Sequence, residues 1–203
     1  VAHGFTSAQL AVIKDGRLAV QQAWGRVNSY NPDGTPKADA APVTNDTMYD
    51  LASVTKMFSV GYAVQKLVSE GQLDVNTPVV ELLGDAFAGD TIELTYAGVE
   101  NPPDLETQRA WKRSLTLRDL LVHEAGFPAA PNYNDPDYDF VNQQRGVPGS
   151  NGNIVSAADR EATLQALFRT PLMYPPHSKT LYSDADYMLA GFIVEAVTGQ
   201  RLD

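Results

Sequence analysis

Residues 51–56 read Leu51-Ala52-Ser53-Val54-Thr55-Lys56, and the spacing of apolar residues changes at this point of the chain. Beyond it, apolar residues recur every three or four positions, which is typical of one buried helical face: Met57, Val60, Val64, Leu67 and Val68. Gly71 is expected to end this helix. The stretch therefore predicts a helix that starts beside Ser53.

Ser53 and Lys56 are three residues apart, so both lie on the same face of that helix. A serine hydroxyl is a poor nucleophile until a base takes its proton. A lysine can be that base only if burial or a nearby positive charge lowers its pKa. The helix N-terminus also favours a developing anion. We predict a nucleophile and its proton acceptor, although chance supplies about one Ser-x-x-Lys match in a chain of this length.

The chain before residue 51 predicts a hairpin. Two runs rich in strand-forming residues, 9–14 and 17–24, are joined by Asp15-Gly16, which favours a two-residue type I′ turn. Residues 26–46 are rich in Asn, Pro, Asp and Gly and are expected to form a surface loop. Two strands alone make a marginal sheet, so we expect the hairpin to need further strands.

The chain after residue 71 is mainly helical in its pattern. Residues 85–114 show no clean period and are expected to be irregular, and residues 128–153 to form a long loop. Helices are predicted from Thr77-Pro78, from the capping box Thr116-Leu-Arg-Asp119 through His123 to Gly126, from Ser156 to Arg169, and from Asp184 to Thr198, the last with Tyr187, Gly191, Val194 and Val197 on one face and Gly199 past its end.

Tyr182-Ser183-Asp184 is a second candidate site, just before the last predicted helix. A tyrosinate beside a lysine can act as a base or a proton relay. The structural alternative is that Tyr182 packs in the core with its hydroxyl on a carbonyl, while Asp184 only caps the helix. Tyr133-Asn134-Asp135 has the same spacing in a loop, so this pattern by itself decides nothing.

Composition excludes several kinds of function. The net charge is -10, and the lysines and arginines form no dense stripe, so we expect no nucleic-acid partner. The chain has no cysteine, and its histidines, His3, His123 and His177, are too scattered for a metal site. We expect no metal and no cofactor. His123 is interpreted as a helix-end residue that fixes the loop at Gly126, and His177 as an exposed loop residue.

Together, Ser53-x-x-Lys56 and Tyr182-x-Asp184 resemble the first two motifs of the penicillin-recognising serine hydrolases, the family of class C β-lactamases, DD-carboxypeptidases and related esterases. Three stretches strengthen the resemblance, which spans nearly the whole chain and is greatest to the penicillin-binding protein 4B type: residues 48–56, residues 115–123 with Gly126-Phe127-Pro128, and residues 182–199.

The resemblance implies that Ser53 attacks a carbonyl to form an acyl-enzyme while Lys56 and Tyr182 move its proton. Position 184 is usually Asn in the family, where it binds the lysine and the substrate amide. Here it is Asp184, and a carboxylate beside Lys56 should raise the pKa of the lysine. We therefore expect the task of the base to shift towards Tyr182.

The resemblance also implies a fold, an α/β sandwich of antiparallel sheet and helices with a helical insertion. Residues 1–203 would be one incomplete N-terminal part of that domain, with the hairpin and loop in residues 1–50 and the mainly helical part in residues 51–203. The family's third motif, Lys/His-x-Gly on a late strand, has no match here in a suitable context. Because one oxyanion donor is worth about 10²–10³ in rate, we expect this part alone to be inactive or nearly so.

The function that the resemblance implies is hydrolysis of the D-Ala-D-Ala end of a cell-wall peptide, with β-lactams as acylating analogues. β-Lactamase or small-ester esterase activity is an alternative, and so is a binding module that captures peptidoglycan without turnover. An extracytoplasmic location, periplasmic or at the cell surface, follows from the resemblance alone, which also leaves room for peripheral association with the membrane or the cell wall.

Overall fold

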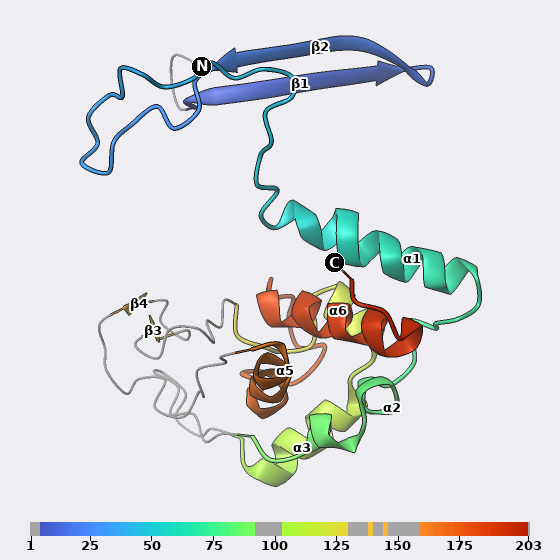
Figure 1. The fold of residues 1–203 in the computed structure, drawn as a ribbon. Helices are drawn as coiled ribbons and strands as arrows, with labels where there is room; N and C mark the ends of the chain where they lie inside the picture. Colours follow the sequence, from blue (N-terminus) through green and yellow to red (C-terminus); the bar gives the residue numbers. More distant parts are fainter. Residues whose placement is uncertain (1–4, 92–102, 130–137, 140–143, 146–158, 203) are drawn as a thin grey trace. The chain divides into compact units, whose positions relative to one another are not determined.

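The computed structural model describes residues 5–91, 103–129, 138–139, 144–145 and 159–202 (Figure 1). The chain divides into two compact units, Val1–Ala52 and Ser53–Asp203. The expectation that residues 1–203 form part of one domain, with an internal boundary near residue 50, stays a prediction.

The first unit is built on an antiparallel hairpin of β1 (Ser7–Lys14) and β2 (Arg17–Gly25). Asp15 and Gly16 join the strands with φ of 51° and 73°, the positive values that a type I′ turn requires. The predicted hairpin is therefore confirmed. Apolar side chains are exposed on both strands, Ile13 at 71% and Leu18 at 56%, as expected for a two-stranded ribbon that needs a covering surface.

The second unit opens with the predicted helix, whose first part is wider than an α-helix. A π-helical segment, η1 (Lys56–Gly61), leads into α1 (Tyr62–Ser69), and Gly71 follows with φ of 69°. Of the predicted apolar face, three residues are buried and two are exposed: Val60, Val64 and Leu67 against Met57 and Val68. A π turn holds more residues than an α turn. Met57, which an α-helical spacing would place on the buried face, is therefore turned away from it.

The prediction of irregular structure for residues 85–114 is wrong for residues 85–88 and 105–114, and residues 92–102 lie outside the described residues. After α2 (Val79–Leu83), which begins beyond Pro78 as expected, the chain forms a 3₁₀ turn, η2 (Asp85–Ala88), and then α3 (Leu105–Ser114).

The sequence concealed α3 because the residues that this helix buries are polar. Gln108 and Lys112 are both buried and lie four residues apart on one face, so no apolar period marks the helix. Its start signal is Asp104, whose carboxylate accepts a hydrogen bond from the Thr107 N–H at 2.8 Å.

The capping box at the start of α4 is confirmed. The Asp119 carboxylate accepts hydrogen bonds from the N–H and the hydroxyl of Thr116, both at 2.8 Å. The remaining elements are α4 (Leu117–Leu121), β3 (Tyr138–Asp139) paired with β4 (Gln144–Arg145), α5 (Arg160–Arg169) and α6 (Asp184–Thr198).

The predicted loop at residues 128–153 lies mostly outside the described residues, and so do Tyr133-Asn134-Asp135 and Ser156. As described, α5 is capped by Asp159, which accepts a hydrogen bond from the Ala162 N–H at 2.8 Å.

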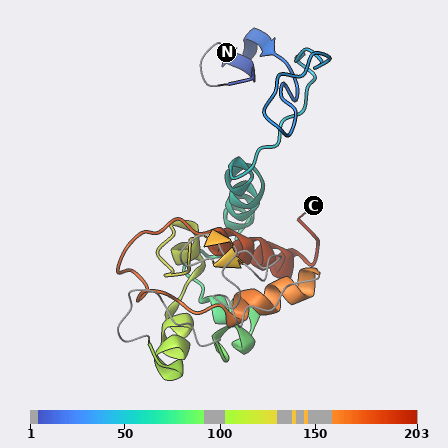
Figure 2. The same ribbon diagram turned by 90° about the vertical axis from the view of Figure 1, so that its left-hand side faces the viewer.

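The core of the second unit surrounds α6, which contacts η1, α2, α4 and α5. Both views show α5 alongside α6 (Figures 1 and 2). The sequence predicted one apolar face, but buried residues lie around most of the helix: Ala185, Asp186, Leu189, Ala190, Gly191, Ile193 and Val194. Gly199 ends α6 with φ of 67°, as predicted. No helix in the described part of the chain combines the length and apolar character needed to cross a membrane.

Candidate active site

Ser53 lies at the start of the first helix of the second unit, one turn before Lys56. The Ser53 carbonyl accepts a hydrogen bond from the Lys56 N–H at 3.1 Å, and the Lys56 ammonium donates to Ser53 Oγ at 3.0 Å. Ala52, immediately before the serine, has φ of 44°, a region that residues with a Cβ rarely occupy. The predicted contact across one helical turn is therefore present.

Asp184 brings the second motif to this pair. Its Oδ1 lies 2.6 Å from Lys56 Nζ, and the two side chains are 43% and 17% exposed. Burial acts to lower the pKa of Lys56, but the hydrogen bonds with Asp184 and Tyr182 outweigh it and the pKa is raised. Lys56 is thus an ammonium at neutral pH, which is the direction expected from an aspartate at position 184.

Tyr182 completes the cluster. Lys56 Nζ lies 4.8 Å from the centroid of its ring. Interaction first with Lys56 and then with the Ser53 hydroxyl lowers the pKa of Tyr182. The tyrosine is 51% exposed, so the alternative that it packs in the core is wrong.

The alternative that Asp184 only caps the helix is also wrong. The cap of α6 is Ser183, whose hydroxyl accepts a hydrogen bond from the Ala185 N–H at 3.2 Å. Asp184 is free to point at Lys56.

Residues 123–129 hold the second motif in place through hydrogen bonds to its backbone and to Ser183. The Leu181 N–H donates to the carbonyl of His123 at 2.9 Å, and the Asp184 N–H to that of Ala129 at 3.0 Å. The Ser183 hydroxyl donates to the carbonyl of Pro128 at 2.6 Å. These contacts fix the chain on both sides of Tyr182.

Gly126 is needed for this segment to run so close to its neighbour. Its φ is 97°, and a Cβ built there would lie 2.4 Å from the carbonyl oxygen of Tyr174. Its own carbonyl accepts a hydrogen bond from the Met173 N–H at 2.7 Å. Only glycine fits both the conformation and the space.

Sequence reasoning missed a second polar pair behind Tyr182. His123 Nδ1 lies 2.7 Å from Asp186 Oδ2, and the His123 ring lies against the Tyr182 ring, with centroids 4.6 Å apart. Asp186 is fully buried, and burial raises its pKa to about 6, against the opposing effect of His123. The available signal was a carboxylate among apolar residues of a strongly buried helix.

His177 behaves as an exposed loop residue, as interpreted. Its side chain is 57% exposed, and its Nδ1 lies 3.4 Å from Asp119 Oδ1. His3 lies outside the described residues. Within the part of the chain that the structure describes, no three potential ligands gather into a metal site.

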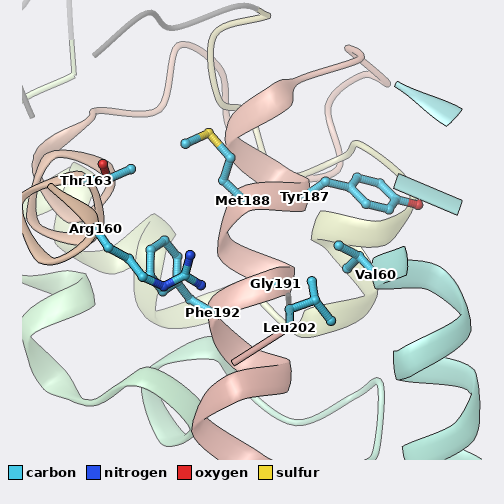
Figure 3. Close-up of a pocket in the computed structure, with 8 residues that line it drawn as sticks. All are labelled: Val60, Arg160, Thr163, Tyr187, Met188, Gly191, Phe192 and Leu202. Carbon is cyan, nitrogen blue, oxygen red and sulfur yellow. The ribbon is translucent and has the colours of Figure 1, made fainter. Parts of the chain in front are cut away.

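A cavity of about 270 Å³ lies along α6 and is lined by residues of η1, α5 and α6 together with Leu202 (Figure 3). Its described lining is mainly apolar, and Arg160, which contributes to it, is paired with Glu195 and lies over the Phe192 ring at 4.7 Å from the centroid. Its lining residues are Val60, Arg160, Thr163, Tyr187, Met188, Gly191, Phe192 and Leu202.

Comparison with known proteins identifies a family for the chain. The family model described as Beta-lactamase matches residues 1–203. A relative named putative D-alanyl-D-alanine carboxypeptidase from Salmonella paratyphi A is 38% identical over 202 residues, which is 98% of this chain and 40% of the relative. One of the same name from Escherichia coli K12 is 39% identical over 201 residues, 98% and 39% of the two chains. The chain thus spans about 40% of the length of these relatives.

Among solved structures, the octameric penicillin-binding protein homologue from Pyrococcus abyssi superimposes with a TM-score of 0.60 at 22% identity, covering 97% of this chain and 36% of that one. At this identity the likeness concerns the fold alone. With the family match it confirms the fold class expected from the motifs, of which this chain holds a part.

Proposed function

Because this chain belongs to the Beta-lactamase family, we propose that its protein is a serine hydrolase that forms an acyl-enzyme on Ser53 and acts on the D-Ala-D-Ala ends of cell-wall peptides. The observation that carries the proposal is the contact of Lys56 Nζ with both Ser53 Oγ and Asp184 Oδ1, at 3.0 Å and 2.6 Å. The names of the relatives from Salmonella and Escherichia coli support the substrate class.

The protonation states support Tyr182 as the base. Lys56 has a raised pKa and donates a hydrogen bond to Ser53 Oγ, so the serine keeps its own proton free to donate elsewhere. Tyr182 has a lowered pKa and interacts with the same hydroxyl. We assign the first proton transfer to the pair Ser53 and Tyr182, with Lys56 stabilising the tyrosinate through its charge.

The reaction then runs in two halves. As Ser53 Oγ bonds to the carbonyl carbon, its proton moves to Tyr182, and the tetrahedral intermediate collapses with loss of the terminal D-Ala amine, which takes that proton. Water then attacks the ester. Tyr182 takes a proton from this water and passes it to Ser53 Oγ, and the shortened peptide is released. The Ser53 N–H, at a helix start, is suited to donate to the oxyanion. A Lys/His-x-Gly strand would be the source of a second donor, and residues 1–203 do not offer it in a suitable context.

The test is covalent labelling of the complete protein with a fluorescent penicillin. We expect one adduct, located by peptide mass spectrometry at Ser53 and absent from Ser53→Ala. Ser59, six residues on in the same helix, provides the matched control, because Ser59→Ala should label like the wild type. A stable adduct supports a carboxypeptidase, and rapid loss of the adduct with turnover of the β-lactam supports a β-lactamase.

Absence of any adduct, with the penicillin or with a fluorophosphonate, would contradict the proposal and favour the non-catalytic binding module. Release of D-Ala from a D-Ala-D-Ala peptide separates a carboxypeptidase from an esterase. Since such peptides lie outside the cytoplasm, the proposal includes extracytoplasmic action, which fractionation of cells carrying the complete protein would test.

A further inference from the structure

Tyr182 needs support from its surroundings, because half of it is exposed. A base acts efficiently only when its reacting atom is held within hydrogen-bond reach of the proton it takes. An exposed tyrosine ring can change its rotamer freely unless neighbours hold it. The contacts on its inner side therefore decide whether its hydroxyl stays at Ser53.

His123 contacts three consecutive residues around Tyr182. Its carbonyl accepts a hydrogen bond from the Leu181 N–H at 2.9 Å. Its ring lies against that of Tyr182, 4.6 Å between centroids and tilted by 42°. Its Nδ1, whose one proton or lone pair is engaged in the 2.7 Å contact with Asp186 Oδ2, lies 3.2 Å from the Ser183 nitrogen. One residue, 59 positions before the tyrosine in the sequence, thus holds the backbone just before the tyrosine and lies against its ring.

Asp186 fixes the orientation of the His123 ring. Its Oδ2 lies 2.7 Å from His123 Nδ1, and its Oδ1 has no hydrogen-bond partner among the described residues. A fully buried carboxyl group with a single partner lowers stability unless that contact is strong. The ring is bounded on another side by Tyr187, whose centroid is 5.2 Å away. The imidazole therefore has little freedom to turn.

We propose that His123, oriented by Asp186, is a positioning residue that holds the Tyr182 ring beside Ser53 and Lys56. The proposal rests on the function proposed above for Ser53 and Tyr182. His123 acts through the tyrosine and does not itself touch the substrate.

The charged groups near Tyr182 set its pKa, and they therefore determine how loss of His123 should change the pH profile. Lys56 is the main cause of the lowered pKa of Tyr182, and Asp184 opposes it weakly. A tyrosine that drifts away from the ammonium regains its ordinary pKa. The limb of the acylation pH profile that reports tyrosinate then moves to higher pH, whereas general damage to the fold would lower the amount of active protein at every pH.

The chain supplies a matched control in His177. Both histidines have left-handed backbones, with φ of 60° at His123 and 63° at His177, and each has Nδ1 near a carboxylate. Asparagine tolerates this conformation, so His123→Asn and His177→Asn remove a ring from equivalent backbones. Only the first removes a ring that touches Tyr182.

The experiment measures the rate of penicillin acylation against pH for the complete protein and three variants. We expect His123→Asn to slow acylation about 10- to 100-fold and to move the tyrosinate limb to higher pH. Asp186→Asn should act in the same direction with a smaller effect, and His177→Asn should match the wild type. Asp186→Asn also serves if His123→Asn does not fold.

A wild-type protein that takes no label at Ser53 would contradict the proposed function itself. A labelled wild type whose His123→Asn and Asp186→Asn variants keep its pH profile, whatever their rate, would overturn the positioning role alone. Equal losses in His123→Asn and His177→Asn would also overturn it.

Discussion

Two lysines of the second unit sit in contrasting surroundings, Lys56 at the start of the first helix and Lys112 in α3. Lys56 is partly exposed and paired with Asp184, and its pKa is raised. Lys112 is fully buried, donates to the carbonyl of Phe168 and lies among aromatic rings, with Nζ 5.3 Å from the centroid of Phe87. Burial lowers its pKa to about 7.

The lysine whose pKa suits a base at neutral pH is therefore the one outside the candidate site. A perturbed pKa marks burial as readily as it marks catalysis. What distinguishes Lys56 is geometry, because it contacts a serine hydroxyl and a carboxylate at once. The following predictions test that distinction.

The largest effect is expected from removing Lys56, with removal of Lys112 as the comparison. Lys56→Met should reduce penicillin acylation of the complete protein by about 10³- to 10⁴-fold or more, the scale seen when one member of a catalytic set is lost. Lys112→Met should leave the acylation rate of the folded protein unchanged. The measurement is stopped-flow labelling with both variants. A large loss of acylation rate in Lys112→Met, after correction for unfolded protein, would contradict the different roles given to Lys56 and Lys112.

Lys112 should instead control stability as pH changes. Its pKa is about 7 when folded and 10.5 ordinarily, so between these values the unfolded state binds more protons. The free energy of unfolding therefore rises with pH across that window, by at most about 1.4 kcal/mol per unit. Below pH 7 the full penalty of burying the ammonium remains.

Urea unfolding of the complete protein at several pH values measures this effect against Lys112→Met. The wild type should gain stability relative to the variant from about pH 7 to 10. Parallel pH dependence in the two proteins would show that Lys112 does not carry it.

The smallest effect is expected from Asp184→Asn, which gives Lys56 a neutral partner like that of Lys112. Loss of the carboxylate should lower the pKa of Lys56, because Asp184 is a main cause of its rise. The alkaline limb of the acylation profile should move to lower pH and the rate should change about tenfold, the scale of one charge-assisted hydrogen bond. An unchanged pH–rate profile would contradict the role assigned to the aspartate.

Local signals in the sequence were enough for much of the fold and for the contact between Ser53 and Lys56. Asp15-Gly16 predicted the hairpin through turn chemistry, and the three-residue spacing of Ser53 and Lys56 predicted their contact through helix geometry. Tyr182 and Asp184 entered through resemblance to a family, because nothing local places them beside a residue more than 120 positions earlier.

What the sequence concealed depends on contacts between distant residues. Gln108 bonds both the N–H and the carbonyl of Leu172, each at 2.9 Å. These hydrogen bonds satisfy the polar side chain and allow it to be buried, and so no apolar period marks α3. The pair of His123 and Asp186 is hidden in the same way, since 63 residues separate its members.

The π-helical segment Lys56–Gly61 has a consequence for insertions and deletions. A π turn is an α-helix that has gained a residue, and each residue advances an α-helix by about 100°. Deleting one residue between Met57 and Gly61 would restore regular winding and leave Ser53 and Lys56 at about the same angle to the buried Val64 and Leu67, whereas a deletion in α1 just before Val64 would turn them by about 100°. A change of one residue in length is therefore absorbed by the π turn but not by the regular helix that follows it.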